Sequence, residues 1–233
     1  DKTKMDERDI TLGADGYKLP GTLTLPKRAV GPDACRVPCV ILVHGSGPHD
    51  RDETIGPNKP FRDLAWGLAK RGIAVRYEKR TKAYGAACVP AGRELDYDTE
   101  AVDDAVAIVE QVRALPELAP DSVYVLGHSL GGTLAPRIAG RSKGLAGIII
   151  LAGLARSLED ALEEQFYYTS SLTDSSVNVK VQLDELKQQL ANVKKLGTEE
   201  FDETISLPLG QPRSYWLFAN AYKPVEVAAK LKL

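Results

Sequence analysis

Uninterrupted apolar runs alternate along much of the chain with segments whose apolar residues recur at helical spacing. Four runs rich in β-branched residues predict strands buried on both faces, at residues 37–43, 73–77, 123–126 and 145–151. Helical patterns lie between them, at residues 61–69, 101–112 and 130–138. Strands and helices that alternate at this spacing predict an α/β fold with a mostly parallel sheet and helices on both faces.

The pattern differs at both ends of this region. Short alternating runs at 8–12 and 21–25, separated by a glycine-containing linker, predict an N-terminal β-hairpin. Between about 155 and 222 the alternation stops, and an apolar stripe there predicts one long helix that faces the body of the domain, flanked by the polar segment 168–176. The stripe consists of Leu183, Leu186, Leu190 and Val193. We therefore expect a core in residues 1–154, a cap over the cleft in 155–222 and a return to the core in 223–233.

The string Gly127-His128-Ser129-Leu130-Gly131-Gly132 matches the G-x-S-x-G nucleophile elbow. A predicted strand precedes it and a predicted helix follows it, which is the context that the motif requires. Small residues on either side of the serine let the strand and the helix approach closely, while the turn presents the hydroxyl above the carboxyl ends of the strands. We therefore expect Ser129 to be a catalytic nucleophile.

A second string, Leu42-Val43-His44-Gly45-Ser46-Gly47-Pro48, ends the first parallel strand. In enzymes with such an elbow, the oxyanion hole uses the N–H after the nucleophile, here that of Leu130, and an N–H from this loop. Ser46 is the expected second donor, with Gly45 as the neighbouring alternative. His44 is interpreted as a residue that braces the loop, because it precedes the nucleophile on a different strand.

A strand that ends in His-Gly, the Gly-His-Ser-Leu-Gly-Gly elbow and an inserted cap together resemble the α/β-hydrolase superfamily. The stretches HGSGPHDRDETIGPNKPF and YEKRTKAYG resemble, more narrowly, bacterial serine carboxylesterases of the dienelactone-hydrolase and acyl-peptidase-like branch. The resemblance covers residues 37–233. It implies a serine hydrolase that cleaves small-molecule carboxylic esters through an acyl-enzyme, without a cofactor or metal. A serine peptidase of the same mechanism and a non-catalytic binding module on the same fold are the alternatives.

The sequence departs from the family pattern after the elbow. The family places an acid and then a histidine beyond the nucleophile, but His44, His49 and His128 all precede Ser129. Residues 230–233 have the pattern of a strand beginning, so roughly 60 residues, or two units of about 30, are expected to be missing together with the last strands. We interpret the chain as a fragment that is nearly inactive alone and pairs with a complementary C-terminal segment or a second copy. A pseudoenzyme, or His49 as an unconventional base, are the competing interpretations.

Composition excludes several other functions. The formal charge of −2 argues against a nucleic-acid-binding surface, and no apolar run is long enough to span a bilayer. No metal-ligand spacing or phosphate-binding loop is present. A start at Asp1 without a methionine is interpreted as processing, which favours an extracytoplasmic bacterial location.

Two charged groups are read as structural. The mixed charges of residues 50–53 are expected to satisfy one another on a loop, and Lys79 and Arg80 are expected to be solvated surface residues. For five aromatic residues of the expected cap, lining of an acyl pocket and packing against the sheet are equally consistent with the sequence. These are Tyr167, Tyr168, Tyr215, Trp216 and Phe218.

Overall fold

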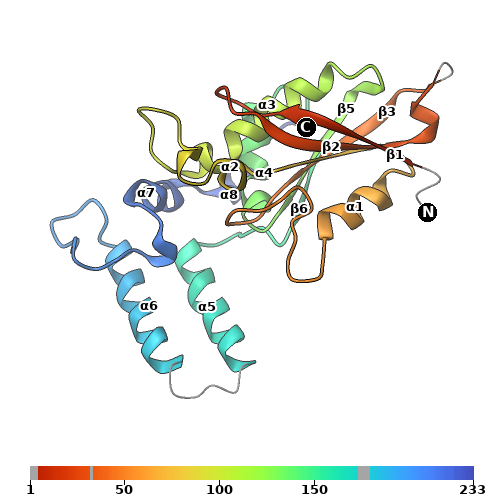
Figure 1. Cartoon of the computed structure of the whole chain (residues 1–233). Coiled ribbons are helices and arrows are strands. Elements are labelled where there is room, and N and C mark those ends of the chain that lie inside the picture. The colour runs from red at the N-terminus through yellow and green to blue at the C-terminus, as the bar shows by residue number, and fades with distance from the viewer. Residues whose placement is uncertain (1–4, 32–33, 173–178) are drawn as a thin grey trace.

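A twisted six-stranded sheet forms the centre of the computed structural model, which describes residues 5–31, 34–172 and 179–233 (Figure 1). The strand order is β1-β2-β4-β3-β5-β6. β3 to β6 run parallel, whereas β1 and β2 form an antiparallel hairpin that joins the sheet at β4. The strands are β1 (Met5–Leu12), β2 (Leu19–Pro26), β3 (Val37–Val43), β4 (Ile73–Tyr77), β5 (Leu118–His128) and β6 (Gly147–Leu151). The predicted hairpin and parallel strands are confirmed, with a longer β5.

Helices cover both faces of the sheet, as the sequence predicts. The buried apolar residues form two clusters. In the smaller one, Phe61 and Ala65 of α1 (Pro60–Leu68) pack with Leu42 on one face of the sheet. The larger cluster lies on the other face, where α3 (Asp103–Arg113) and α4 (Leu130–Arg141) contribute Ile108 and Leu134. α8 (Pro224–Ala228) packs on α4. Shorter elements complete the body: η2 (Lys27–Ala29), α2 (Arg80–Tyr84), η3 (Gly85–Cys88) and the π-helical turn η4 (Asp98–Val102).

The segment between β6 and α8 contains more helix than the sequence predicts. In place of one long helix it holds α5 (Leu158–Ser171), α6 (Val179–Val193), the 3-10 turn η5 (Pro208–Gly210) and α7 (Arg213–Ala221). Part of the expected polar flank therefore belongs to α5, and residues 173–178 lie outside the described residues. The α5 sequence starts with a Ser157 cap, whose hydroxyl accepts a hydrogen bond from the Asp160 N–H, a signal that the sequence prediction missed.

The predicted orientation of the α6 stripe is wrong. α6 packs against α5 and η5, and the α5–α6 pair extends away from the sheet (Figure 1). Leu190 and Val193, near the base of the pair, are buried, while Leu183 and Leu186 are half-buried. An apolar stripe specifies that a helix needs a partner surface but does not specify which one. Here the neighbouring helix α5 provides it in place of the body of the domain.

Among the described residues, β6 forms one edge of the sheet, opposite the hairpin strand β1. It pairs with β5 on one side only, and three of its apolar side chains remain more than a third exposed: Ile149 at 39%, Ile150 at 46% and Leu151 at 37%. Parallel strands are ordinarily covered on both faces, so exposure of this kind marks a surface that another segment can cover.

Candidate functional site

Ser129 lies at the junction of β5 and α4 with a backbone conformation that is rare for a residue with a side chain. Its φ is 51° and its ψ is −114°, a region that glycine occupies readily and other residues avoid. The neighbouring glycines allow the turn. A Cβ at Gly127 would lie 2.1 Å from the Gly131 carbonyl oxygen, and one at Gly131 would lie 2.2 Å from the Val43 carbonyl oxygen. The elbow geometry predicted from the motif is thus present.

Hydrogen bonds hold the backbone of Ser129 on both sides. Its N–H donates to the Leu151 carbonyl at the end of β6 over 2.8 Å, and its carbonyl accepts from the Thr133 N–H at 2.9 Å. Thr133 also connects the two ends of the segment between β6 and α8. Its hydroxyl accepts from the Leu154 N–H at 2.9 Å, and its carbonyl accepts from the Tyr222 hydroxyl at 2.9 Å.

Ser129 opens into a cleft of about 350 Å³ that it shares with Ser46 and Leu130. The parallel register makes this possible, because Val43 at the end of β3 pairs with Gly127 of β5 and brings the following loops together. The contact is close: a Cβ on Gly45 would lie 3.3 Å from the Ser129 Cβ. The remaining walls are mostly apolar, and they include residues of the expected cap, namely Leu158, Leu162, Gln165, Leu209 and Tyr215.

Both polar atoms of Gly45 are already engaged by buried charged side chains. Its N–H donates to Glu53 Oε1 over 2.7 Å, and its carbonyl accepts from Lys79 Nζ over 2.8 Å. Within the described residues, no hydrogen bond engages the N–H of Ser46 or of Leu130. The geometry therefore favours Ser46 over the alternative Gly45 as the loop donor.

His44 is buried and braces the loop, as the sequence interpretation has it. Its Nε2–H donates to the Asp50 carbonyl over 3.0 Å, and its ring packs against Phe61 and Tyr77. Burial, with smaller contributions from the positive charge of Lys79 and from His49, lowers the pKa of His44 to about 3. The ring is therefore neutral near pH 7 and lies outside the lining of the cleft.

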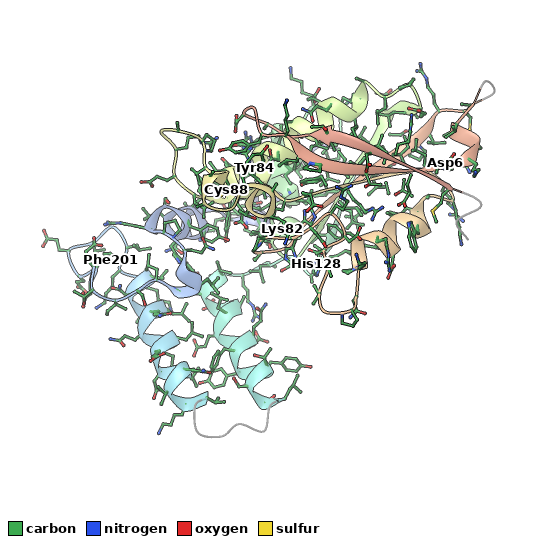
Figure 2. All side chains as sticks on the ribbon, in the orientation of Figure 1. Asp6, Lys82, Tyr84, Cys88, His128 and Phe201 are labelled. Carbon is green, nitrogen blue, oxygen red and sulfur yellow. The ribbon has the colours of Figure 1, made fainter. Side chains whose placement is uncertain are left out.

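His49 and His128 both line the cleft. His49 Nε2–H donates to the Ser46 carbonyl over 2.7 Å, which leaves Nδ1 as its basic nitrogen. His128 Nδ1 lies 3.0 Å from Glu53 Oε1, on the side of the sheet body that faces the α5–α6 pair (Figure 2). The sequence does not reveal this Glu53–His128 contact. Its only signal is that His128 lies in the elbow string and Glu53 in the stretch HGSGPHDRDETIGPNKPF, because the approach of the two residues depends on the sheet register.

Three of the four charged residues at 50–53 are structural, as predicted, but their charged groups pair with groups outside the cluster and not with one another. Asp50 accepts from the N–H and the hydroxyl of Thr54, Arg51 pairs with Glu78, and Asp52 pairs with Arg76. Glu53 is the exception. It is 1% exposed with a φ of 51°, it lines the cleft, and its Oε2 has no hydrogen-bond partner in the described part of the chain.

The prediction that Lys79 and Arg80 are solvated surface residues is wrong. Lys79 is 2% exposed and pairs with Glu100, whereas Arg80 is fully buried and forms two hydrogen bonds with Asp104, at 2.8 and 2.7 Å. Glu100 and Asp104 lie one turn apart where η4 meets α3. The consecutive residues Lys79 and Arg80 thus pair with two acidic residues that are four positions apart on the same helical segment. Neither segment reveals this pairing when its sequence is read alone.

The aromatic residues of the expected cap divide between both interpretations. Tyr215 is buried and lines the cleft, and Trp216 is fully buried with its indole N–H donating to the Pro208 carbonyl. Phe218 packs against Tyr97. Tyr167 and Tyr168 are 47% and 65% exposed and do neither.

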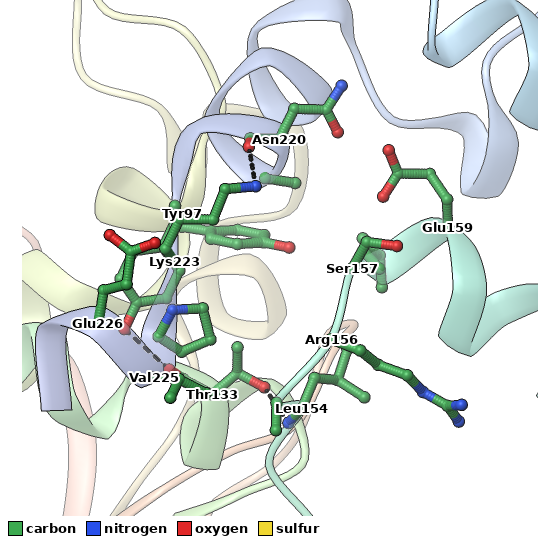
Figure 3. Close-up of a pocket in the computed structure, with 15 residues that line it drawn as sticks. Tyr97, Thr133, Leu154, Arg156, Ser157, Glu159, Asn220, Lys223, Val225 and Glu226 are labelled. Atoms are coloured by element: carbon green, nitrogen blue, oxygen red, sulfur yellow. Dashed lines mark hydrogen bonds between the residues drawn. The ribbon is translucent and has the colours of Figure 1, made fainter. Parts of the chain in front are cut away.

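A second cavity of about 330 Å³ adjoins the cleft (Figure 3). The two share Tyr97, Thr133, Leu154 and Leu158, and the second cavity continues toward α8. Its lining includes charged side chains of both signs, from Arg156, Glu159, Lys223 and Glu226. No group of three or more potential metal ligands occurs in the described residues, and none of the described helices is both long and apolar enough to cross a membrane.

Comparison with known proteins places the chain in a family. Residues 40–225 match the alpha/beta hydrolase family. Esterase EstD of Thermotoga maritima is 39% identical over 234 residues, which cover 100% of this chain and 51% of that protein. The chain thus spans about half the length of this curated relative.

Solved structures agree on the fold. Acetyl xylan esterase 1 from Thermoanaerobacterium sp. JW/SL YS485 superposes with a TM-score of 0.54 at 13% identity, covering 99% of this chain and 66% of that one. The α/β hydrolase GrgF from Penicillium sp. sh18 superposes with a TM-score of 0.53 at 16% identity, covering 96% and 75%. With the sheet order, the elbow and the family match in agreement, this chain belongs to the alpha/beta hydrolase family.

Proposed function

We propose that this chain is the nucleophile-bearing part of a serine hydrolase that cleaves carboxylic esters through an acyl-enzyme. The main support for this proposal is the strained elbow at Ser129, which opens into a cleft. The N–H groups of Ser46 and Leu130 at this cleft have no hydrogen-bond partner in the described structure. The esterase relative from Thermotoga maritima supports an ester as the substrate class.

In this mechanism the Ser129 hydroxyl attacks the ester carbonyl carbon and expels the alcohol, leaving the acyl group on the serine oxygen. The N–H groups of Ser46 and Leu130 donate to the oxyanion as negative charge develops on it. Leu130 also begins α4, whose N-terminal end favours negative charge. Water then releases the acid and restores the serine.

The base and the acid of the triad are proposed to come from outside these 233 residues. No histidine follows Ser129, and the chain matches about half of its esterase relative. The exposed edge of β6 ends beside the elbow, because Leu151 accepts the Ser129 N–H. A complementary segment that adds a strand there would bring its loops next to the nucleophile.

The segment 155–222 is proposed to act as a cap. Five of its residues line the Ser129 cleft, namely Leu158, Leu162, Gln165, Leu209 and Tyr215. The walls are largely apolar, and Glu53 is the one acidic or basic side chain among the described lining residues, apart from the histidines. Such a cleft suits an uncharged acyl group.

Turnover of p-nitrophenyl esters and labelling by a fluorophosphonate test the proposal. We expect the longest natural protein containing this chain to be active and Ser129→Ala to lose about 10⁶-fold in turnover. The 233-residue chain by itself should be nearly inactive. Unchanged turnover in Ser129→Ala would contradict the nucleophile assignment. Robust Ser129-dependent turnover by the isolated chain would instead move the base to His49.

A further inference from the structure

We propose that Lys79 is a positioning residue that aims the Ser46 N–H into the Ser129 cleft. The inference rests on the proposed function of Ser129 and extends it to a residue that does not touch the cleft. Lys79 lies in the short connection between β4 and α2 and is 2% exposed, so its ammonium group points into the protein. Its Nζ donates to the Gly45 carbonyl over 2.8 Å and pairs with Glu100.

The argument depends on the geometry of one peptide group. The Gly45 carbonyl and the Ser46 N–H belong to the same peptide unit, and no peptide bond in the described residues is cis. In a trans peptide the C=O and N–H point in opposite directions. Lys79 does not line the cleft, whereas Gly45 and Ser46 do. Holding the carbonyl on the Lys79 side therefore turns the Ser46 N–H toward the cleft.

Glu53 prevents the Gly45 N–H from acting as the donor in place of the Ser46 N–H. It accepts the Gly45 N–H at 2.7 Å, so the preceding peptide is fixed as well and its N–H is unavailable to a substrate. The loop is thus held at two consecutive peptides by buried side chains of opposite charge. Of these two consecutive N–H groups, the one on Ser46 is therefore the one left to donate into the cleft.

The charge of Lys79 adds to its effect on geometry. A hydrogen bond from an ammonium group polarises the carbonyl that accepts it, and polarisation along a peptide strengthens the N–H as a donor. Burying the ammonium is costly unless a carboxylate compensates for it, and Glu100, itself 4% exposed, is that partner. The Lys79–Glu100 pair therefore places a buried donor at a fixed point behind the oxyanion loop.

The test removes the donor together with its counter-charge. We compare Lys79→Met/Glu100→Gln with Arg80→Met/Asp104→Asn, which removes the adjacent buried ion pair without touching the loop. The assays are kcat and KM for p-nitrophenyl acetate, the inhibition constant of a trifluoromethyl ketone and the thermal midpoint, all in the longest natural protein that contains this chain. Lys79→Met/Glu100→Leu serves if the first variant does not fold, because an apolar pair often replaces a buried ion pair without loss of stability.

We expect loss of the Lys79 donor to lower kcat by about 10- to 100-fold, since removing an oxyanion donor outright costs about 10²- to 10³-fold. KM should stay within about twofold, and the ketone, which mimics the tetrahedral intermediate, should bind more weakly by a factor similar to the loss in kcat. The Arg80 control should keep its kcat even where its thermal midpoint falls. A folded Lys79 variant with unchanged kcat, or with the same kinetics as the control, overturns the inference. An active Ser129→Ala overturns the proposed function instead.

Discussion

Replacing Ser129 by glycine or by alanine separates the cost of its backbone conformation from the chemistry of its hydroxyl. Both variants remove the proposed nucleophile, so both should be inactive. They differ in the conformation that each residue tolerates. Alanine keeps a Cβ at a φ of 51° and a ψ of −114°, whereas glycine occupies that region without steric cost.

The magnitude follows from two opposing contributions. A residue with a side chain held in such a region costs about 1–3 kcal/mol, and glycine relieves this cost in the folded protein. Glycine also gains freedom in the unfolded chain, which lowers stability by about 0.4–1 kcal/mol relative to alanine. We therefore expect Ser129→Gly to be about 1 kcal/mol more stable than Ser129→Ala, a difference of about 2–4 °C in the thermal midpoint for a chain of this size.

Urea unfolding followed by circular dichroism measures the difference, and Ser142 provides the matched control. Ser142 closes α4 with an ordinary extended backbone, at a φ of −98° and a ψ of 142°. There the order should reverse, with Ser142→Gly less stable than Ser142→Ala by about 0.5–1 kcal/mol. If alanine were as stable as glycine at position 129, the elbow would carry no strain and this reasoning would be refuted.

Three further predictions concern single positions. Gly127→Ala should destabilise the fold by about 3 kcal/mol or more by urea unfolding, because its Cβ would lie 2.1 Å from the Gly131 oxygen. Gly67→Ala, in an exposed part of α1 with open space around it, should be neutral or stabilising, and equal losses at both positions would contradict the packing argument. The pKa of His44 is about 3 in the folded protein, below its value of about 6.5 in the unfolded chain. Between these two pH values the unfolded chain binds more protons than the folded protein. The free energy of unfolding should therefore decrease on acidification through this window, by up to about 1.4 kcal/mol per pH unit. His44→Gln should flatten that dependence in thermal melts from pH 7 to pH 4, and an unchanged slope would exclude His44 as its source. Ile150→Lys on the exposed edge of β6 should reduce self-association of the isolated 233-residue chain in sedimentation velocity, and unchanged association would place the contact elsewhere.

The parts of the fold with strong local signals were predictable from the sequence. Continuous β-branched runs located the parallel strands, and the glycines around Ser129 located the elbow, because each signal acts within a few residues of the feature it specifies. The proposed loop donor rests on a signal of the same kind. Ser46 lies three residues after β3, which pairs in the sheet with β5, the strand that leads into the elbow.

The features that were missed depend on residues far apart in the sequence. Lys79 and Arg80 resemble surface residues until Glu100 and Asp104 are placed beside them. The α6 stripe likewise indicates an apolar contact without naming the surface that supplies it. In each case the missing information is which distant segment satisfies a charge or covers an apolar face, and only the assembled sheet provides it.

Thr133 has a consequence for how this fold can vary. Leu154, directly before the expected cap, and Tyr222 at its end both hydrogen-bond to this one residue, one turn beyond Ser129. Because both ends of this long insertion bind the same residue, the points where it leaves and rejoins the sheet body lie close together. The entropic cost of closing a loop between two such points rises only with the logarithm of the loop length. Segments of quite different length are therefore interchangeable at this point, so the proposed cap can change while the elbow at Ser129 stays the same.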